Sequence, residues 1–152
     1  MNVSGHGISI DLPDGWEGRI YRRRLPKTCP VLHAGSFALP QGDGDFGGDA
    51  IAAMAADDVF LALLEYDPAL AGTGLFNEPG MPLPLRSGEF SPAAFRRRQA
   101  GRLGVQRFFT EQDRPFCLYV VVGSDAIEPP RASVKRANRI LRTVSIRPGA
   151  PT

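Results

Sequence analysis

An uninterrupted apolar stretch, FCLYVVV at residues 116–122, constrains this chain more than any other feature of its sequence. Successive side chains of an extended strand point to opposite faces, so both faces of such a strand would be apolar. A strand with one solvated face alternates apolar and polar residues instead, so this strand has to be covered on both sides. Polar residues at 111–114 precede it and predict a turn. We therefore expect a β-hairpin over 105–123 whose second arm is central in a sheet.

Other segments complete the expected set of elements. Residues 58–67, DVFLALLEYD, are also apolar on both faces and predict a second central strand. Shorter β-rich segments predict strands at 7–13, 18–24, 31–39, 83–86 and 143–147. Helices are expected at 49–56, with Asp49 as the N-cap, and at 131–142.

The order of these elements predicts an α+β fold, with a single, largely antiparallel sheet and helices packed on both of its faces. At 152 residues the chain suits one domain, spanning 1–152. No run of eighteen apolar residues predicts a transmembrane helix, and the first residues lack the features of a signal peptide, so we expect a cytoplasmic protein.

Charge is distributed unevenly, although the net charge is only +2. Residues 28–85 contain eight acidic residues and no basic ones, whereas residues 86–152 contain thirteen basic and five acidic residues. The asymmetry indicates either two oppositely charged surfaces or pairing of the two halves within the fold. An ordinary solvated surface is the third interpretation. The candidate partner-binding residues are Arg131, Lys135, Arg139 and Arg142 on one side of the predicted helix, together with Arg96, Arg97 and Arg98.

Two motifs suggest bound ligands but are better explained as structure. Residues 42–47, GDGDFG, match the GxGxxG pattern between a predicted strand and a helix. However, Asp43 and Asp45 would repel a pyrophosphate, and no βαβ unit surrounds the motif. Together with Asp49 these carboxylates could bind calcium weakly, but Met54 stands where an EF-hand needs an acidic residue. A glycine-rich turn is the preferred interpretation.

The residue types that metal binding and catalysis need are not gathered in the sequence. Cys29 and His33 have the C-x₃-H spacing, but no second ligand pair accompanies them, so no metal site is predicted. Cys117 lies in the middle of a strand without a sequence-adjacent base. Glu65 and Asp67 could form an acid–base pair, yet residues two apart at a strand end are commonly solvated. We therefore expect no catalytic residues and no cofactor.

Three short motifs of this chain resemble the PsbP-like fold family. They are the opening GISIDLPDGW, the strand start at Arg114-Pro115-Phe116 and the closing ANRILRTVSIRP. The resemblance spans nearly the whole chain and implies an αβα sandwich that serves binding or assembly without catalysis. No metal or ligand residue of the family can be matched here, and the lipidated cysteine near the start of some of its members is missing. Function is inferred from this resemblance by fold analogy alone.

The leading hypothesis is a non-catalytic binding or assembly protein. Its arginine-rich surface would contact an acidic protein, which could be a second copy of the same chain. An alternative is a small-ligand binder or small enzyme with a pocket roofed by residues 68–92. A third is a nucleic-acid binder, which we disfavour because Phe95, Phe108 and Phe109 are better explained as core residues than as an exposed stacking surface.

Overall fold

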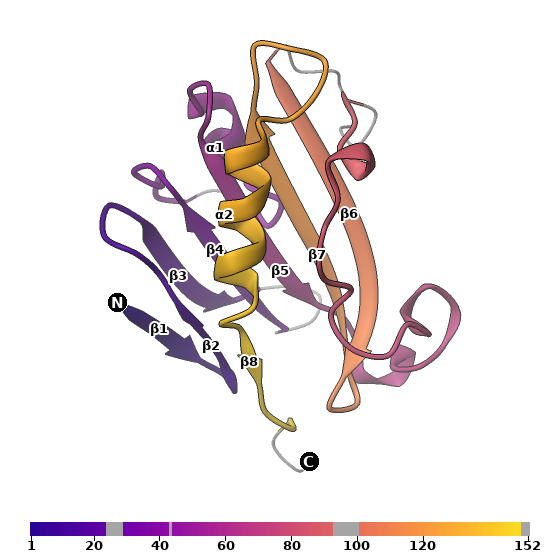
Figure 1. The fold of residues 1–152 in the computed structure, drawn as a ribbon. Helices are drawn as coiled ribbons and strands as arrows, with labels where there is room; N and C mark the ends of the chain where they lie inside the picture. Colours follow the sequence, from indigo (N-terminus) through magenta and orange to yellow (C-terminus); the bar gives the residue numbers. More distant parts are fainter. Residues whose placement is uncertain (24–28, 43, 93–100, 150–152) are drawn as a thin grey trace.

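Two antiparallel sheets form the frame of the protein. The structure is a computed structural model and describes residues 1–23, 29–42, 44–92 and 101–149 (Figure 1). The large sheet has the order β3 (Glu17–Arg22), β4 (Pro30–Gly35), β5 (Val59–Glu65), β7 (Arg114–Gly123) and β6 (Arg102–Glu111). The small sheet has the order β1 (Asn2–Gly5), β2 (Ile8–Asp11) and β8 (Ser145–Ile146).

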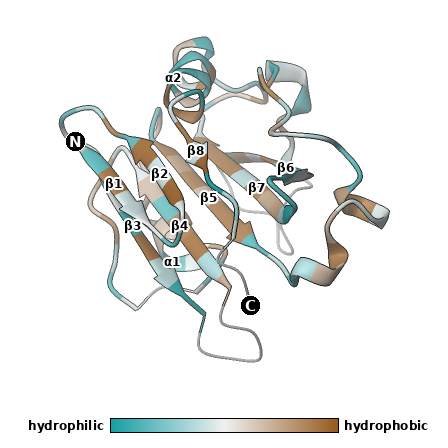
Figure 2. Ribbon diagram, turned by 90° about the horizontal axis from the view of Figure 1, so that it is seen from below, coloured by the Kyte–Doolittle hydropathy of each residue, from teal (hydrophilic) through white to brown (hydrophobic). Residues whose placement is uncertain are grey.

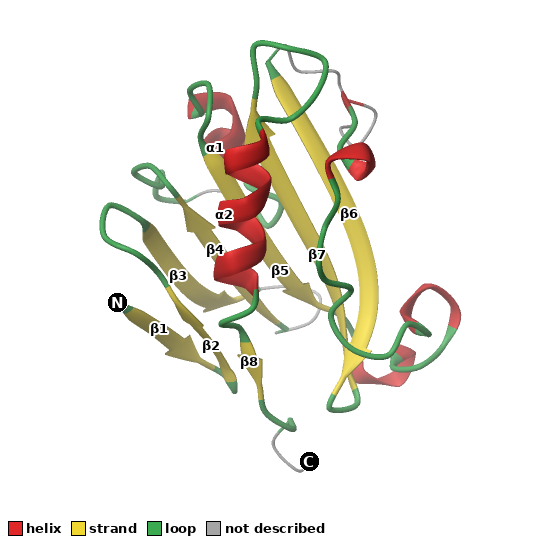
Figure 3. Ribbon diagram, viewed as in Figure 1, coloured by secondary structure: helices red, strands yellow, loops and turns green. Residues whose placement is uncertain are grey.

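The helices that the structure describes are short. Within the described residues, α2 (Arg131–Leu141) is the only helix of seven or more residues, and α1 (Gly48–Ala53) has six. Three short 3₁₀-helices lie at Pro68–Leu70, Gly74–Phe76 and Ser87–Glu89. Figure 3 shows α2 lying across the large sheet, beside the small one.

The prediction of two central strands is confirmed. β5 pairs with β4 and β7, and β7 pairs with β5 and β6, so neither is an edge strand. Every residue of both strands is buried, including Phe116, Tyr119 and Val121. Figure 2 shows the hydrophobic colouring along these two strands. The hairpin also forms, and its turn places Gln112 and Asp113 at φ 55° and 60°, the left-handed conformation that a two-residue hairpin turn requires.

The predicted fold class, a single sheet with helices packed on both faces as in the PsbP-like sandwich, is wrong. The protein is mostly β, with sheets of three and five strands. One face of the large sheet is covered by α2 together with the small sheet, which contributes Ile8 and Ile10 to the core. The other face is covered by the short helix α1, through Ala50, Ile51 and Met54, and by adjoining loops.

The predicted fold class was wrong because of the local structure at residues 2–11. Residues 2–5 form a strand of their own, because His6 (φ 53°) and Gly7 (φ 77°) reverse the chain into a hairpin with β2. β2 then pairs on its other side with β8, where Ile8 faces Ile146. Strands that we expected in one sheet therefore form a second layer, which covers one face of the large sheet together with α2.

Other local predictions are corrected as well. Asp49 lies inside the first turn of α1, and Gly47 is the N-cap. A side chain at Gly47 would overlap the ring of Phe60, since a Cβ at that position would lie only 2.3 Å from Cζ. Residues 83–86 form no strand. Both backbone groups of Leu85 instead bond the Asn138 side chain of α2, the N–H donating to Oδ1 (2.7 Å) and the carbonyl accepting from Nδ2 (2.9 Å).

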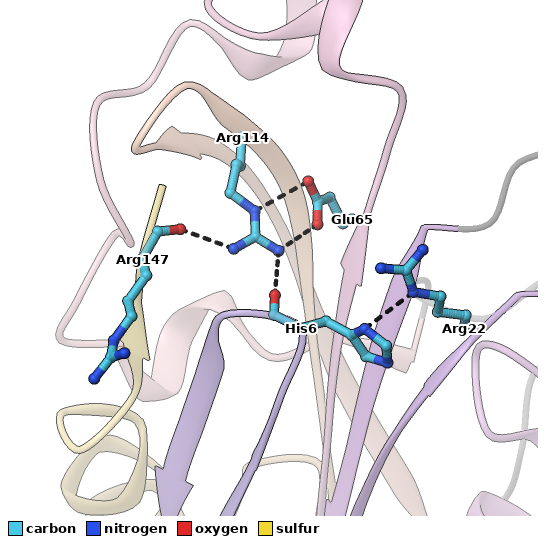
Figure 4. Close-up of polar contacts among 5 residues, drawn as sticks. All are labelled: His6, Arg22, Glu65, Arg114 and Arg147. Carbon is cyan, nitrogen blue, oxygen red and sulfur yellow. Dashed lines mark hydrogen bonds and ion pairs between the residues drawn. The ribbon is translucent and has the colours of Figure 1, made fainter. Parts of the chain in front are cut away.

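One buried side chain, Arg114, joins the two sheets (Figure 4). It is 5% exposed and donates to both carboxylate oxygens of Glu65, from Nε to Oε2 (3.1 Å) and from Nη2 to Oε1 (2.6 Å). Nη1 also donates to the carbonyl of Arg147 after β8 (2.8 Å), and Nη2 to the carbonyl of His6 in the β1–β2 turn (2.9 Å). Glu65 is buried too, so the guanidinium and carboxylate satisfy each other away from solvent.

We predict that Val120→Asp abolishes cooperative folding. Val120 is fully buried in β7, and an unpaired charge there costs several kcal/mol against a total stability of about 5–15 kcal/mol. Circular dichroism and thermal melting measure the effect. Gln106→Asp, on the exposed side of the same hairpin, is the matched control and should melt close to the wild type. A Val120→Asp protein with unchanged melting would show that the central position of β7 is wrong.

Breaking the Arg114–Glu65 pair should destabilise the protein more than breaking a surface pair. Removing one partner of a buried ion pair costs about 3–5 kcal/mol. Denaturant unfolding of Glu65→Met, Arg114→Met and the double variant Arg114→Met/Glu65→Met gives the coupling energy. We expect the double variant to lose less than the sum of the two single changes.

The control for this cycle is Arg107→Met, which removes an exposed arginine that pairs with Glu89. Its cost should stay below about 1 kcal/mol, because exposed ion pairs contribute little. Equal losses for Arg107→Met and Arg114→Met would contradict the special role of the buried pair.

Candidate functional site

The predicted basic residues of α2 lie together on its outer side. Pro129 and Pro130 end the preceding loop, and the helix runs from Arg131 to Leu141. Its apolar side packs into the core and consists of Val134, Ala137, Ile140 and Leu141. The opposite side is exposed, and together with the C-cap residue Arg142 we call it the basic face: Arg131, Lys135, Arg139 and Arg142. The spacing of four, four and three residues aligns these side chains along the helix.

Within the described residues, no acidic group neutralises the basic face. No carboxylate of the described residues forms an ion pair with any of its four side chains. Arg131 and Lys135, and likewise Lys135 and Arg139, are like-charge neighbours at i,i+4, an arrangement that destabilises a helix by a few tenths of a kcal/mol per pair. The other predicted binding residues, Arg96, Arg97 and Arg98, lie outside the described residues.

Other arginines of the basic half of the chain do serve the fold. Arg102 donates from Nε to the carbonyl of Ile51 (2.8 Å) and from Nη2 to that of Met54, and so satisfies acceptors at the C-terminal end of α1. Arg136 donates to the carbonyl of Asp57 (2.5 Å). Arg114 of the basic half pairs with Glu65 of the acidic half, so pairing of the two halves within the fold accounts for part of the charge asymmetry.

A groove of about 470 Å³ borders the basic face. It lies between α2 and the turn that leads from β2 to β3. Its apolar floor includes Leu12, Trp16 and Ile140, all buried. Arg139 belongs both to the groove and to the basic face. No pattern in the sequence points to this groove, because its walls are more than 100 residues apart in the chain.

The glycine-rich loop is held by polar contacts to the large sheet. Asp45 accepts a hydrogen bond from the Tyr21 hydroxyl (2.9 Å) and forms an ion pair with Arg23 (3.4 Å). Its backbone carbonyl accepts from Nε2 of His33, which is completely buried (2.8 Å). Asp45 therefore holds a loop against strands β3 and β4, and His33 uses one ring nitrogen for the same purpose. Asp43, the other carboxylate of the motif, lies outside the described residues.

The candidate acid–base pair is not assembled. Glu65, expected to be solvated, is buried and bound to Arg114. Asp67 accepts a hydrogen bond from the backbone N–H of Ala69 (3.0 Å) and caps the 3₁₀-helix at Pro68–Leu70. The signal that could have identified Glu65 is the unusual placement of a carboxylate directly after six apolar strand residues.

Burial opposes nucleophilic chemistry at Cys117. It raises the pKa of the thiol to about 12, so the group stays protonated at neutral pH, where only the thiolate would be reactive. Burial likewise raises the pKa of Tyr119, its neighbour on the same face of β7, to about 12. These residues are parts of the second core cluster, which packs against α1.

Neither a metal site nor a membrane-spanning helix is found in the part of the chain that the structure describes. Among those residues, no group of three or more His, Cys, Asp or Glu side chains is placed to hold a metal ion. In the same ranges, no helix combines the length and the apolar character needed to cross a membrane.

The segment 68–92, expected to roof a pocket, runs along the outer edge of the large sheet. Pro79 and Ser91 form isolated bridges to Thr110 and Gly104 of β6. Leu85 and Phe90 are buried in the core between this segment and α2. Two grooves formed by described residues are lined by other parts of the chain.

We predict that Cys117 resists alkylation while Cys29 reacts. At pH 8 the Cys117 thiol is protonated and inaccessible, whereas Cys29 is partly exposed. Iodoacetamide labelling followed by mass spectrometry should modify Cys29 first and Cys117 only after denaturation. The Cys29→Ser variant gives the reactivity of Cys117 alone. Rapid native labelling of that variant would contradict the buried position of Cys117.

Comparisons with known proteins give no match for this chain: no protein-family model, no curated protein and no solved structure is significantly similar to it.

Proposed function

We propose that this domain is a non-catalytic binding protein that contacts an acidic protein partner through the basic face of α2. The observation that carries the proposal is the set of four exposed cations on one side of a single helix, none of them in an ion pair with a described residue. A partner that presents carboxylates would supply the missing counter-charges.

The contrast with the other arginines supports this choice. Arg102, Arg114 and Arg136 bind carbonyls or a carboxylate of the protein itself. The basic face instead keeps like charges next to one another at a small cost in helix stability. Arginine is also enriched at protein interfaces, where its planar guanidinium can bind a carboxylate through two parallel hydrogen bonds.

A protein partner fits the surface better than a nucleic acid does. Readers of single-stranded RNA present aromatic side chains on an exposed sheet face. Here Phe109 is completely buried, and Phe108 packs against Phe76 with ring centres 5.6 Å apart. The partner can be another protein or a second copy of this chain.

We place the protein in the cytoplasm in this proposal, because its two cysteines are thiols and thiols persist in a reducing compartment.

The test compares two variants with equal losses of charge. The first replaces the basic face by glutamine: Arg131→Gln, Lys135→Gln, Arg139→Gln and Arg142→Gln. The control replaces four exposed arginines elsewhere: Arg22→Gln, Arg86→Gln, Arg107→Gln and Arg147→Gln. Partners are captured on the wild-type protein from the native cell and identified. Their affinity for all three proteins is then measured by calorimetry at low and high salt.

We expect the basic-face variant to bind the partner more weakly by on the order of tenfold or more, with a smaller dependence on salt. The control should bind within a few-fold of the wild type. Both variants should melt close to the wild type, because exposed charges contribute little to folding. Equal binding by both variants would contradict the proposal, and so would marked unfolding of the basic-face variant, since its charges would then be paired within the fold.

The same measurements separate the partner classes. For a nucleic acid, the slope of log affinity against log salt should decrease by about 0.9 for each phosphate contact removed. For a second copy of the chain, analytical ultracentrifugation should show concentration-dependent association that the basic-face variant loses. Either result would replace the separate acidic protein as the partner.

A further inference from the structure

The groove beside α2 has rigid walls. On one side, residues 13–15 make a tight turn that the backbone N–H of Trp16 closes onto the carbonyl of Pro13 (3.3 Å). On the other side stands α2, with Arg136, Arg139 and Ile140. Thr143 connects the walls, because its hydroxyl oxygen accepts from the backbone N–H of Asp11 (3.0 Å). Its hydroxyl also donates to the carbonyl of Ile140 (2.6 Å). The groove is therefore preformed.

The lining of the groove carries charges of both signs. Arg139 lies on the helix wall and Asp14 on the turn wall, and both are exposed. Neither side chain forms a hydrogen bond or an ion pair with another described residue, so they do not pair with each other across the groove. Arg136 and Asp11 repeat this polarity, although Arg136 binds the carbonyl of Asp57 and Asp11 accepts from Asn2 (2.7 Å).

This arrangement matches a ligand that has an apolar body and opposite charges at its two ends. A volume of about 470 Å³ lies within the range of small-molecule sites. The buried side chains of Leu12, Trp16 and Ile140 would contact the apolar body. A carboxylate would bind a guanidinium, which offers paired donors, and an ammonium would bind a carboxylate.

We propose that this groove binds a short apolar peptide with free termini, of two or three residues. The peptide carboxylate binds Arg139 and its ammonium binds Asp14, while its side chains lie against Trp16 and Ile140. Two or three extended residues separate the termini by about 7–10 Å, so such a peptide carries its two charges at opposite ends of a short apolar body. This proposal does not rest on the protein partner proposed above, although the two surfaces share Arg139.

The protein carries its own reporter for this site. Trp16 is the only tryptophan in the chain and lines the groove, so its fluorescence reports occupancy directly. The probe is leucyl-leucine, which has no aromatic ring. Its N-acetyl form lacks the ammonium, its amide lacks the carboxylate, and free leucine lacks the length. We expect a saturable change in Trp16 emission with leucyl-leucine, and affinities weaker by about tenfold for each blocked form.

Two variants assign the ends of the ligand. Arg139→Gln should weaken leucyl-leucine binding by about tenfold and remove its advantage over the amide. Asp14→Asn should also weaken leucyl-leucine binding by about tenfold, and leucyl-leucine should then bind no better than its N-acetyl form. These pairings of a variant with a blocked end form a thermodynamic cycle that a purely structural effect would not reproduce. The matched controls are Arg142→Gln and Asp125→Asn, which are exposed and lie outside the groove.

The proposal is overturned if leucyl-leucine gives no saturable signal at millimolar concentrations. It is also overturned if the blocked forms bind as well as the free peptide, which would indicate an internal segment of a longer chain as the occupant. Failure here is distinguishable from failure of the partner proposal. Asp14→Asn should leave partner capture unchanged, and Lys135→Gln should weaken capture while leucyl-leucine binding stays the same.

Discussion

The buried ion pair between Arg114 and Glu65 is the constraint on which the arrangement of the two sheets depends. A guanidinium without a partner could not remain in this position, because the loss of hydration would exceed any gain from packing. Glu65 fixes it within the large sheet, and its remaining donors are satisfied only when the carbonyls of His6 and Arg147 arrive from the small sheet. The hydrogen bonds of Arg114 therefore depend on the docking of the small sheet against the large one.

Sequence patterns predicted the parts of this fold that are determined locally. β5 and β7 are evident because the apolar residues cover both faces of each strand, and α2 is evident from its helical periodicity. The second sheet was not predictable in this way. It needs Ile8 to pair with Ile146 and a non-glycine residue, His6, to adopt a left-handed turn. Neither requirement leaves a pattern within a short window.

The candidate site divides in the same manner. The basic face of α2 follows from a regular spacing along one helix, so its members could be named from sequence alone. The groove next to it unites residues 11–16 with residues 136–143, and only the tertiary structure brings them together. Glu65 was misjudged for the same reason: its partner Arg114 is 49 positions away. Residues whose role follows from local spacing could be predicted. Residues whose role depends on a partner far away in the sequence could not.

The pairing of β2 with β8 has a consequence for the order of events during folding. β1 and β2 leave the ribosome early, but the strand that completes their sheet, Ser145–Ile146, is synthesised after every strand of the large sheet. Until then one edge of β2 has no pairing strand, and Arg114 lacks one of its carbonyl acceptors. Closing a contact of such sequence separation is slow, because the intervening chain must be ordered first. The nascent chain therefore remains incomplete, with an exposed strand edge, until residues 145–147 are available.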